Sequence, residues 1–223
     1  MNSFYENTKE DFITILWRKP DVMKLLNNHY PHLLETYNNY PKGIQRADFI
    51  RYIILHHYGG VYSDVDCSLT QPLRDVIAVA YHNGEDLDFL AAHELTVYDT
   101  SSTAHFPIRT NLPVGERMED NYRVANYFMM SKPKSPTALD IINLCIERAK
   151  IPIDMHNDYD ILFSTGPDVT STVINRKFGV EKMGLMGAIV SMSLRHHARG
   201  QWRSNAGPIR PSPTRIGKVL YTY

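Results

Sequence analysis

Apolar residues recur at a helical spacing over Ile44–Tyr58. The positions that share one face lie three or four residues apart: Ile44, Ala47, Ile50, Ile54 and His57. Such a face can be buried along the whole length of a helix. Gly59 follows directly, where the end of a helix favours a residue that tolerates positive φ. The pattern therefore predicts a helix over Ile44–Tyr58 that ends at Gly59.

Other segments show shorter patterns that alternate between strand and helix. We expect strands at Phe12–Trp17, Val61–Ser68, Leu87–Ala92, Arg123–Met130 and Gly187–Leu194. We expect helices at Asp21–Asn38 (broken at Pro31), Ser135–Lys150 and Thr165–Phe178, the last one capped by Thr165. Thr96–Asn121 is polar and predicts a long loop or lid. This alternation predicts one α/β domain over residues 1–223.

Composition narrows the class of protein. Lys+Arg and Asp+Glu both number 24, so no clustered basic surface for nucleic acid is expected. Cys67 and Cys145 are the two cysteines, far apart, which disfavours a disulfide framework or a thiolate zinc site. No apolar run approaches the length of a membrane span, and the first residues contain no signal-peptide core.

Two aspartates follow the glycine pair, at Asp64 and Asp66. In a continuous strand they share one face with Tyr62, with the two carboxylates roughly 6–7 Å apart. That separation suits one direct metal ligand and a second acid that acts through water or a substrate hydroxyl. Carboxylate oxygens suit Mg²⁺ or Mn²⁺ together with phosphate oxygens. Two exposed acids on an edge strand are the commoner case, but here an apolar strand, two glycines and a helix surround them.

The stretch "RADFIRYIILHHYGGVYSDVDCSLTQPL", which begins at Arg46, resembles the DxD region of a glycosyltransferase sugar-binding family. That family includes fungal initiating α-1,6-mannosyltransferases, mannosyl-inositolphosphoceramide synthases and bacterial and viral capsule-type transferases. The segments "VANYFMMSKPKSP", "STGPDV" and "HHARGQW" are similar to further motifs of the family. The resemblance runs from about Phe12 to Trp202.

The resemblance implies a GT-A-like nucleotide-sugar transferase fold, with a mixed central sheet flanked by helices. It also implies metal-dependent transfer of a hexose-type sugar, with retention, from a nucleoside-diphosphate sugar to a hydroxyl of a glycan, glycolipid or glycoprotein. Mn²⁺ or Mg²⁺ would be the cofactor. Relatives usually begin with one more strand, which contacts the nucleotide base. In this sequence the first expected strand is Phe12–Trp17, so that preceding strand is missing.

The resemblance also implies roles for the residues that stand at the matched motif positions of this sequence. The implied metal ligands are Asp64, Asp66 and His196, with Asp66 the more direct of the two acids. The implied catalytic residues are Asp48, Arg51 and Asn126. The implied donor-binding residues are Asp48, Arg51, Gly60, Tyr62, Asp64 and Trp202.

Each role has a simpler alternative. Asp48 and Arg51 are three residues apart, so they also fit a salt bridge on a helix face. Asn126 also fits a side chain that satisfies backbone groups at a strand end, His196 a structural histidine and Trp202 a core anchor.

Two other functions stay open from the sequence. One is a catalytically weak, sugar-binding remnant of the family, which the missing first strand favours. A second departure from the family's pattern is Gln201, where relatives usually have serine. The other function is a DxD phosphatase, which needs a later paired acid, and Asp158 and Asp160 lie in a polar stretch instead. We expect a cytoplasmic protein of bacterial or viral type, and a Golgi-type anchor would have to lie outside this chain.

Overall fold

The architecture comes from a computed structural model that describes residues 6–82, 87–93, 124–154, 158–179, 194–196 and 217–222. Its first half contains β1 (Phe12–Trp17), α2 (Lys19–His29), a 3₁₀ turn (Pro31–Leu33), α3 (Leu34–Asn39), α4 (Gly43–Tyr58), β2 (Gly60–Ser63), β3 (Cys67–Leu69), α5 (Leu73–His82) and β4 (Phe89–His93). Then follow β5 (Val124–Ser131), α7 (Pro136–Arg148), α8 (Asp158–Thr165), α9 (Pro167–Phe178), β6 (Leu194–His196) and β7 (Gly217–Thr222).

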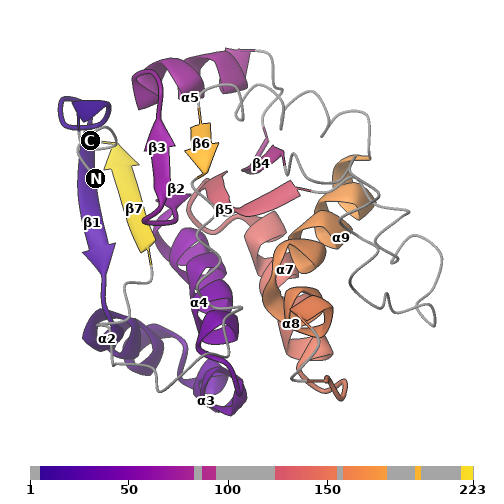
Figure 1. Cartoon of the computed structure of the whole chain (residues 1–223). Coiled ribbons are helices and arrows are strands. Elements are labelled where there is room, and N and C mark those ends of the chain that lie inside the picture. The colour runs from indigo at the N-terminus through magenta and orange to yellow at the C-terminus, as the bar shows by residue number, and fades with distance from the viewer. Residues whose placement is uncertain are drawn as a thin grey trace.

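The main sheet has the strand order β1-β7-β2-β5-β4. Every neighbouring pair among these described strands is antiparallel, whereas the sequence predicts a mixed sheet. β3 and β6 form a separate antiparallel pair. β7, which no sequence pattern predicts, lies between β1 and β2 and so joins the two ends of the described chain in one sheet (Figure 1).

Alternating side chains of the sheet enter two separate cores. Tyr62 of β2 and Met129 of β5 face a core that is shared with α2, α4, α7 and α9. Val61 and Phe128, their neighbours along the chain, face a second core that α5 covers. A period of two residues explains this division, because successive side chains of a strand point to opposite faces. The predicted α/β architecture, a central sheet flanked by helices, is confirmed.

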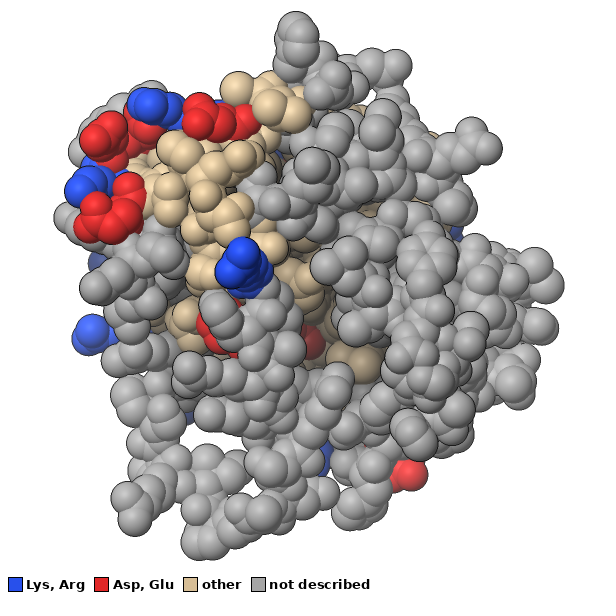
Figure 2. All heavy atoms as spheres, turned by 45° about the horizontal axis from the view of Figure 1, so that its top comes forward, with Lys and Arg blue, Asp and Glu red and all other residues tan. Residues whose placement is uncertain are grey.

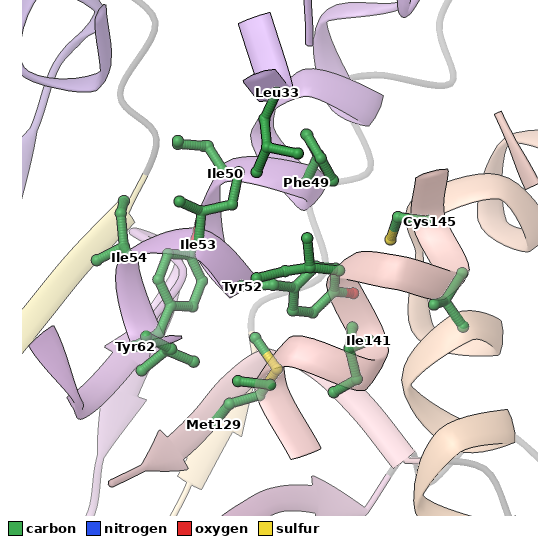
Figure 3. Packing of buried hydrophobic residues seen from close by; sticks show 14 of the residues in the cluster. Leu33, Phe49, Ile50, Tyr52, Ile53, Ile54, Tyr62, Met129, Ile141 and Cys145 are labelled. Carbon is green, nitrogen blue, oxygen red and sulfur yellow. The ribbon is translucent and has the colours of Figure 1, made fainter. Parts of the chain in front are cut away.

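The central helix α4 is buried on most of its circumference. Its buried residues are Gln45 and all eight from Asp48 to Leu55. Figure 3 shows α4 side chains such as Ile50, Tyr52 and Ile54 pointing in different directions into the surrounding core. A helix that is buried on several faces belongs to the interior of a domain. The single apolar face expected from the sequence is therefore too narrow a description, and the polar residues Asp48 and Arg51 are carried into the interior.

Gly59 ends α4 as predicted, with φ at 72°. A Cβ at this position would lie 2.6 Å from Cδ of Pro133, which precedes α7. Both the left-handed backbone and the close approach of Pro133 require glycine here. The chain can therefore turn sharply from α4 into β2, and this turn positions the aspartates that follow.

Several other predicted elements are confirmed with small shifts at their ends: Phe12–Trp17, the break at Pro31, Arg123–Met130, Ser135–Lys150 and Thr165–Phe178. Leu87–Ala92 is observed as Phe89–His93. The loop prediction for Thr96–Asn121 lies outside the described residues, as does Gly187–Leu194 except for its last residue. Helix α8 (Asp158–Thr165) is not predicted, because its sequence begins in a polar stretch.

The surface of the described part carries charges of both signs. Figure 2 shows Lys or Arg and Asp or Glu side chains gathered together at one corner of the face in view. Lys9 with Glu6 and Arg74 with Asp11 are ion pairs between exposed side chains, and such pairs contribute little to stability. None of the helices in the described ranges is long and apolar enough to cross a membrane.

Candidate active site

The two aspartates of the DxD motif stand in a turn, not in a continuous strand. β2 ends at Ser63 and β3 begins at Cys67. The backbone N–H of Cys67 donates to the carbonyl of Asp64 over 3.2 Å and closes the turn. The prediction of one strand over Val61–Ser68 is therefore wrong, and the carboxylate spacing that was derived from a continuous strand loses its basis. The turn instead carries Asp64 and Asp66 out of the sheet at the carboxyl end of β2.

Asp64 is held from behind by two buried side chains. Its backbone N–H donates to the carbonyl of Tyr127 on β5 over 2.8 Å, which anchors the start of the turn. Its Oδ1 accepts a 2.8 Å hydrogen bond from the Tyr62 hydroxyl and lies 3.5 Å from Nη1 of Arg51. The Asp64 side chain is 28% exposed, whereas Arg51 is 3% exposed. Asp64 therefore links the buried cluster to the surface.

The guanidinium of Arg51 is fixed on every side. Nη2 lies 2.6 Å from Oδ1 of Asp48, and Nη1 donates to the carbonyl of Asn126 over 2.6 Å. Nε donates to the carbonyl of Ala47, and the guanidinium lies 4.9 Å from the ring centre of Tyr62. Burial opposes the charged form, but Asp64 and Asp48 hold the pKa of Arg51 above its usual value. A charged, rigid fork suits the recognition of phosphate and hydroxyl oxygens.

Asp48 sits at the buried end of the same ion pair. The alternative of a salt bridge with Arg51 on one helix face is observed, but the Asp48 side chain is 4% exposed, so the pair is buried and not part of the surface. Burial raises the pKa of Asp48 to about 7, against the opposing effect of Arg51 and of hydrogen bonds from Thr165 and Asn126. A carboxyl group whose pKa lies near neutrality inside a charged cluster is typical of a functional site.

Asn126 brings β5 into the cluster. Its Nδ2 donates to Oδ1 of Asp48 and to the hydroxyl of Tyr52, over 3.2 Å in each case. Thr165, at the end of α8, donates its hydroxyl to Oδ2 of Asp48 over 3.3 Å. Residues from α4, β2, β5 and α8 thus meet at one point, although they are up to 117 positions apart in sequence.

Sequence reasoning missed two members of this cluster, Tyr52 and Thr165. Tyr52 follows Arg51 directly in the matched motif, and this position is the signal that was available. Thr165 was predicted to cap the next helix, but Gly166 is the N-cap of α9 and the Thr165 hydroxyl bonds to Asp48 instead. The capping prediction is therefore wrong.

The remaining predicted site residues are described only in part. Gly60 begins β2 with φ at 88°, at the opposite end of the strand from Asp64. In the β3–β6 pair, His196 is the register partner of Cys67, the residue directly after Asp66. The side chain of His196 is not among the described ones, and Trp202 lies outside the described residues.

The donor set at the turn fits a divalent cation in part. Within the ranges that the structure describes, no three His, Cys, Asp or Glu side chains gather closely enough to hold a metal. Asp64 and Asp66 offer two carboxylates on a partly exposed turn. Mg²⁺ and similar cations are commonly held by one or two carboxylates together with phosphate oxygens of a substrate. The two acids fit such a shared site.

Asp160, one of the two later acids of the sequence, makes a hydrogen bond that holds the backbone near α8. Asp160 is buried and accepts a 2.7 Å hydrogen bond from the backbone N–H of Asp154. It lies at the start of α8 and stabilises the turn that precedes this helix.

A cleft between described residues lies elsewhere. It measures about 330 Å³ and is lined by residues of α3, the start of α4, α7 and α8, among them Tyr40, Gln45, Arg148 and Ser164. The side chains of Gln45 and Ser164 bond to each other over 2.8 Å. The cleft therefore lies at the start of α4, whereas the aspartate turn contacts this helix at Arg51.

Comparisons with known proteins agree with the motif order. Residues 2–83 match a family model described as "Glycosyltransferase sugar-binding region containing DXD motif". Mannosyl phosphorylinositol ceramide synthase SUR1 of Saccharomyces cerevisiae is 43% identical over 68 residues, which are 30% of this chain and 18% of that protein. Inositol phosphoceramide mannosyltransferase 1 of Schizosaccharomyces pombe is 38% identical over 66 residues, 30% of this chain and 21% of that protein.

A longer match extends past the DxD region. Putative glycosyltransferase HOC1 of Saccharomyces cerevisiae is 26% identical over 165 residues, which are 69% of this chain and 38% of that protein. The chain thus spans well under half the length of these curated relatives. They are fungal proteins, and the expectation of a cytoplasmic protein of bacterial or viral type is therefore wrong.

The motif order in the sequence, the buried cluster behind the aspartate turn and these matches agree. The resemblance to the DXD-containing glycosyltransferase sugar-binding family is confirmed, and residues 2–83 carry the matched region.

Proposed function

We propose that the chain is a metal-dependent, retaining glycosyltransferase of GT-A-like fold. It moves a hexose-type sugar from a nucleoside-diphosphate sugar to a hydroxyl group of a glycan or glycolipid. The observation that carries this proposal is the contact of Arg51 with both Asp48 and Asp64, which joins a buried acid, a fixed cation and a partly exposed acid at the end of β2.

Charge explains why such a cluster suits a diphosphate leaving group. Asp64 and Asp66 on the partly exposed turn would hold the divalent cation, which would supply positive charge to a diphosphate leaving group. Arg51 lies directly behind Asp64, 3.5 Å from its Oδ1, and orients this carboxylate. Preorganised charges of this kind need no rearrangement during the reaction.

The buried residues shape the part of the site that receives the sugar. Asp48 and Asn126 present carboxylate and amide groups, which recognise sugar hydroxyls by hydrogen bonds. In a retaining transfer the acceptor hydroxyl attacks on the side from which the diphosphate leaves. The departing phosphate then accepts the proton, so the proposal assigns no side chain as general base.

The names of two relatives indicate the sugar and the acceptor. SUR1 is named as a mannosyl phosphorylinositol ceramide synthase, and the Schizosaccharomyces pombe relative as an inositol phosphoceramide mannosyltransferase. We therefore propose mannose as the first hexose to test and a phosphoinositol glycolipid as the first acceptor. The identity of the nucleotide is left to the screen below.

The test is a screen of GDP- and UDP-hexoses with the purified chain, in Mn²⁺, in Mg²⁺ and in chelator. The readouts are release of the nucleoside diphosphate and the rise in melting temperature that a bound donor causes by mass action. Asp66→Asn should lower turnover on the order of a hundredfold. Asp75→Asn is the matched control, because Asp75 is a 56% exposed acid on α5.

Each outcome separates the candidate functions. Metal-dependent turnover that Asp66→Asn abolishes and Asp75→Asn retains supports the transferase. Donor binding without turnover, for every hexose and metal, would favour the sugar-binding remnant. Unchanged turnover of Asp66→Asn in chelator would overturn the metal-dependent mechanism, and release of phosphate from a simple phosphomonoester would favour the phosphatase.

A further inference from the structure

A chain of buried hydrogen bonds runs behind the proposed donor site, and the Tyr52 hydroxyl is at its centre. This hydroxyl donates to the carbonyl of Thr165 over 2.9 Å and accepts from the hydroxyl of Thr170 over 2.9 Å. It also accepts from Nδ2 of Asn126 over 3.2 Å. One donor and two acceptor positions is the full capacity of a hydroxyl, so every bond that Tyr52 can make is used inside the protein.

Neither Tyr52 nor Thr165 can reach a ligand directly. Both residues are 0% exposed. Figure 3 shows Tyr52 in the layer between α4 and α7, close to Ile141 and Cys145 and behind the strand of Met129. Any effect of these two residues on a bound sugar must therefore pass through the side chains that they contact.

The first of those side chains is Asn126. Its two amide hydrogens are directed at Oδ1 of Asp48 and at the hydroxyl of Tyr52. An amide with both N–H bonds fixed has a single orientation, which leaves its carbonyl oxygen on the opposite side. If the Tyr52 hydroxyl is removed, one of these bonds is lost, and the amide is free to rotate.

The second side chain is Asp48. Oδ1 is shared by Arg51 and Asn126, while Oδ2 accepts from Thr165. The hydroxyl of Thr165 thus sets the rotation of the carboxylate about its last bond. Thr165 is the last residue of α8, one position before the N-cap Gly166 of α9, and its hydroxyl bonds to Asp48 on α4.

We propose that Tyr52 and Thr165 are positioning residues for the donor sugar. They fix the Asn126 amide and the Asp48 carboxylate in the orientation that recognises the hexose, and they leave the diphosphate to Asp64, Asp66 and Arg51. This inference rests on the proposed glycosyltransferase function. It assigns the turn between α8 and α9 a part in sugar recognition, although no side chain of that turn touches the sugar.

The test compares variants that differ by one hydroxyl. Tyr52→Phe and Thr165→Val remove the two hydroxyls, and Thr165→Ser restores the second one. Thr172→Val is the matched control: Thr172 is also a fully buried threonine of this region, and its hydroxyl bonds to the carbonyl of Asp168 and to Arg148. The probes are GDP-mannose against GDP, or UDP-glucose against UDP, according to the screen above.

Affinity in the presence of Mn²⁺ is measured by calorimetry below the melting temperature of every variant, together with kcat and KM. We expect Thr165→Val and Tyr52→Phe to bind the nucleotide hexose about tenfold more weakly, or to lose about tenfold in kcat, because they release groups that orient direct ligands. Their affinity for the nucleoside diphosphate alone should equal that of the wild type. Thr165→Ser should regain most of the loss, and Thr172→Val should show none.

Three results would overturn the proposal. Equal weakening of nucleotide hexose and nucleoside diphosphate would show a general structural role. Behaviour of Thr165→Val identical to that of Thr172→Val would remove Thr165 from sugar recognition. If Tyr52→Phe does not fold, the comparison of Thr165→Val with Thr165→Ser decides alone. A wild type that binds no nucleotide hexose overturns the proposed function itself, whereas an active wild type with unaffected variants overturns only this inference.

Discussion

Tyr62 donates a 2.8 Å hydrogen bond to Oδ1 of Asp64, although Tyr62 is wholly buried and Asp64 reaches the surface. The hydroxyl and the carboxylate are two positions apart, on the same side of the chain as it leaves β2. Burial raises the pKa of Tyr62 well above its usual value, so the phenol stays protonated and remains a donor. The exposed acid of the site is thus oriented from inside the core.

Removing this hydroxyl should loosen Asp64 without unfolding the domain. In Tyr62→Phe we expect donor affinity in Mn²⁺ to fall several-fold and stability to fall by about 1 kcal/mol, the usual value of one hydrogen bond. Donor titration and urea unfolding measure the two effects. Tyr40→Phe is the control, because the buried Tyr40 hydroxyl donates to the carbonyl of Cys145 away from the turn. Equal donor affinities in the two variants would contradict the role of Tyr62.

Arg51 should affect both stability and donor turnover. Its partner Asp48 lies 2.6 Å away in the core, and a buried pair that loses its geometry costs about 3 kcal/mol. Lysine also lacks the planar guanidinium, whose separate N–H groups bond to the Asn126 carbonyl and to Asp48 at the same time. We therefore expect urea unfolding at a lower concentration and at least tenfold slower turnover in the folded protein.

A second buried pair provides the control for that experiment. Arg148 and Asp168 are also 2.6 Å apart and 2% exposed. Arg148→Lys should lose comparable stability while the folded protein keeps its donor turnover. Equal losses of turnover in both variants would show that Arg51 acts through folding alone.

The raised pKa of Asp48 predicts a pH dependence of stability. Burial brings the pKa to about 7 in the folded protein, from 3.8. Because the folded state holds the proton more tightly, this group favours folding fully below about pH 4 and loses that contribution as the pH rises to about 7. Over this interval the wild type should lose about 1.4 kcal/mol per pH unit relative to Asp48→Asn, which does not titrate.

Urea unfolding of wild type and Asp48→Asn at pH 5 and pH 7.5 measures this difference. The variant keeps a side chain of the same size and can still accept one hydrogen bond, so it is expected to fold. Parallel stabilities at the two pH values would contradict a raised pKa. A wild type that gains stability over the variant with rising pH would mean that Arg51 dominates over burial.

The local pattern of apolar and polar residues was sufficient to predict most helices and strands. It was not sufficient to predict how the site residues are arranged. The helix at Ile44–Tyr58 and its end at Gly59 follow from spacing and from the conformational freedom of glycine, which are local properties. β7 was not predicted, because its place between β1 and β2 depends on pairing with residues 155 to 210 positions away. The turn at Asp64 was read as strand because Val65 and Cys67 suit a strand equally well.

The candidate site shows the same division. Motif order identified Asp48, Arg51, Asp64 and Asn126, and the structure brings these four together. The burial of Asp48 and Arg51 was not predictable, because an amphipathic pattern for α4 places its polar residues on the exposed side. The contribution of Thr165 depends on α8 packing against α4, and sequence spacing contains no information on that contact.

His196 is the one predicted metal ligand from the second half of the chain, and its backbone lies beside the aspartate turn. The β3–β6 register pairs His196 with Cys67, directly after Asp66. Residues adjacent along a strand point to opposite faces, so His196 and His197 would differ in their direction if the strand continued. The family resemblance assigns the metal to His196.

We therefore expect His196→Ala to raise the Mn²⁺ concentration that gives half-maximal donor turnover, by about tenfold, the usual loss for one supporting ligand. The effect should be smaller with Mg²⁺, because imidazole is a poorer ligand for this harder ion than for Mn²⁺. His197→Ala is the matched control, and its Mn²⁺ titration should overlay the wild type. Two variants that both overlay the wild type would remove histidine from the site, whereas an effect confined to His197→Ala would mean that the resemblance is shifted by one residue.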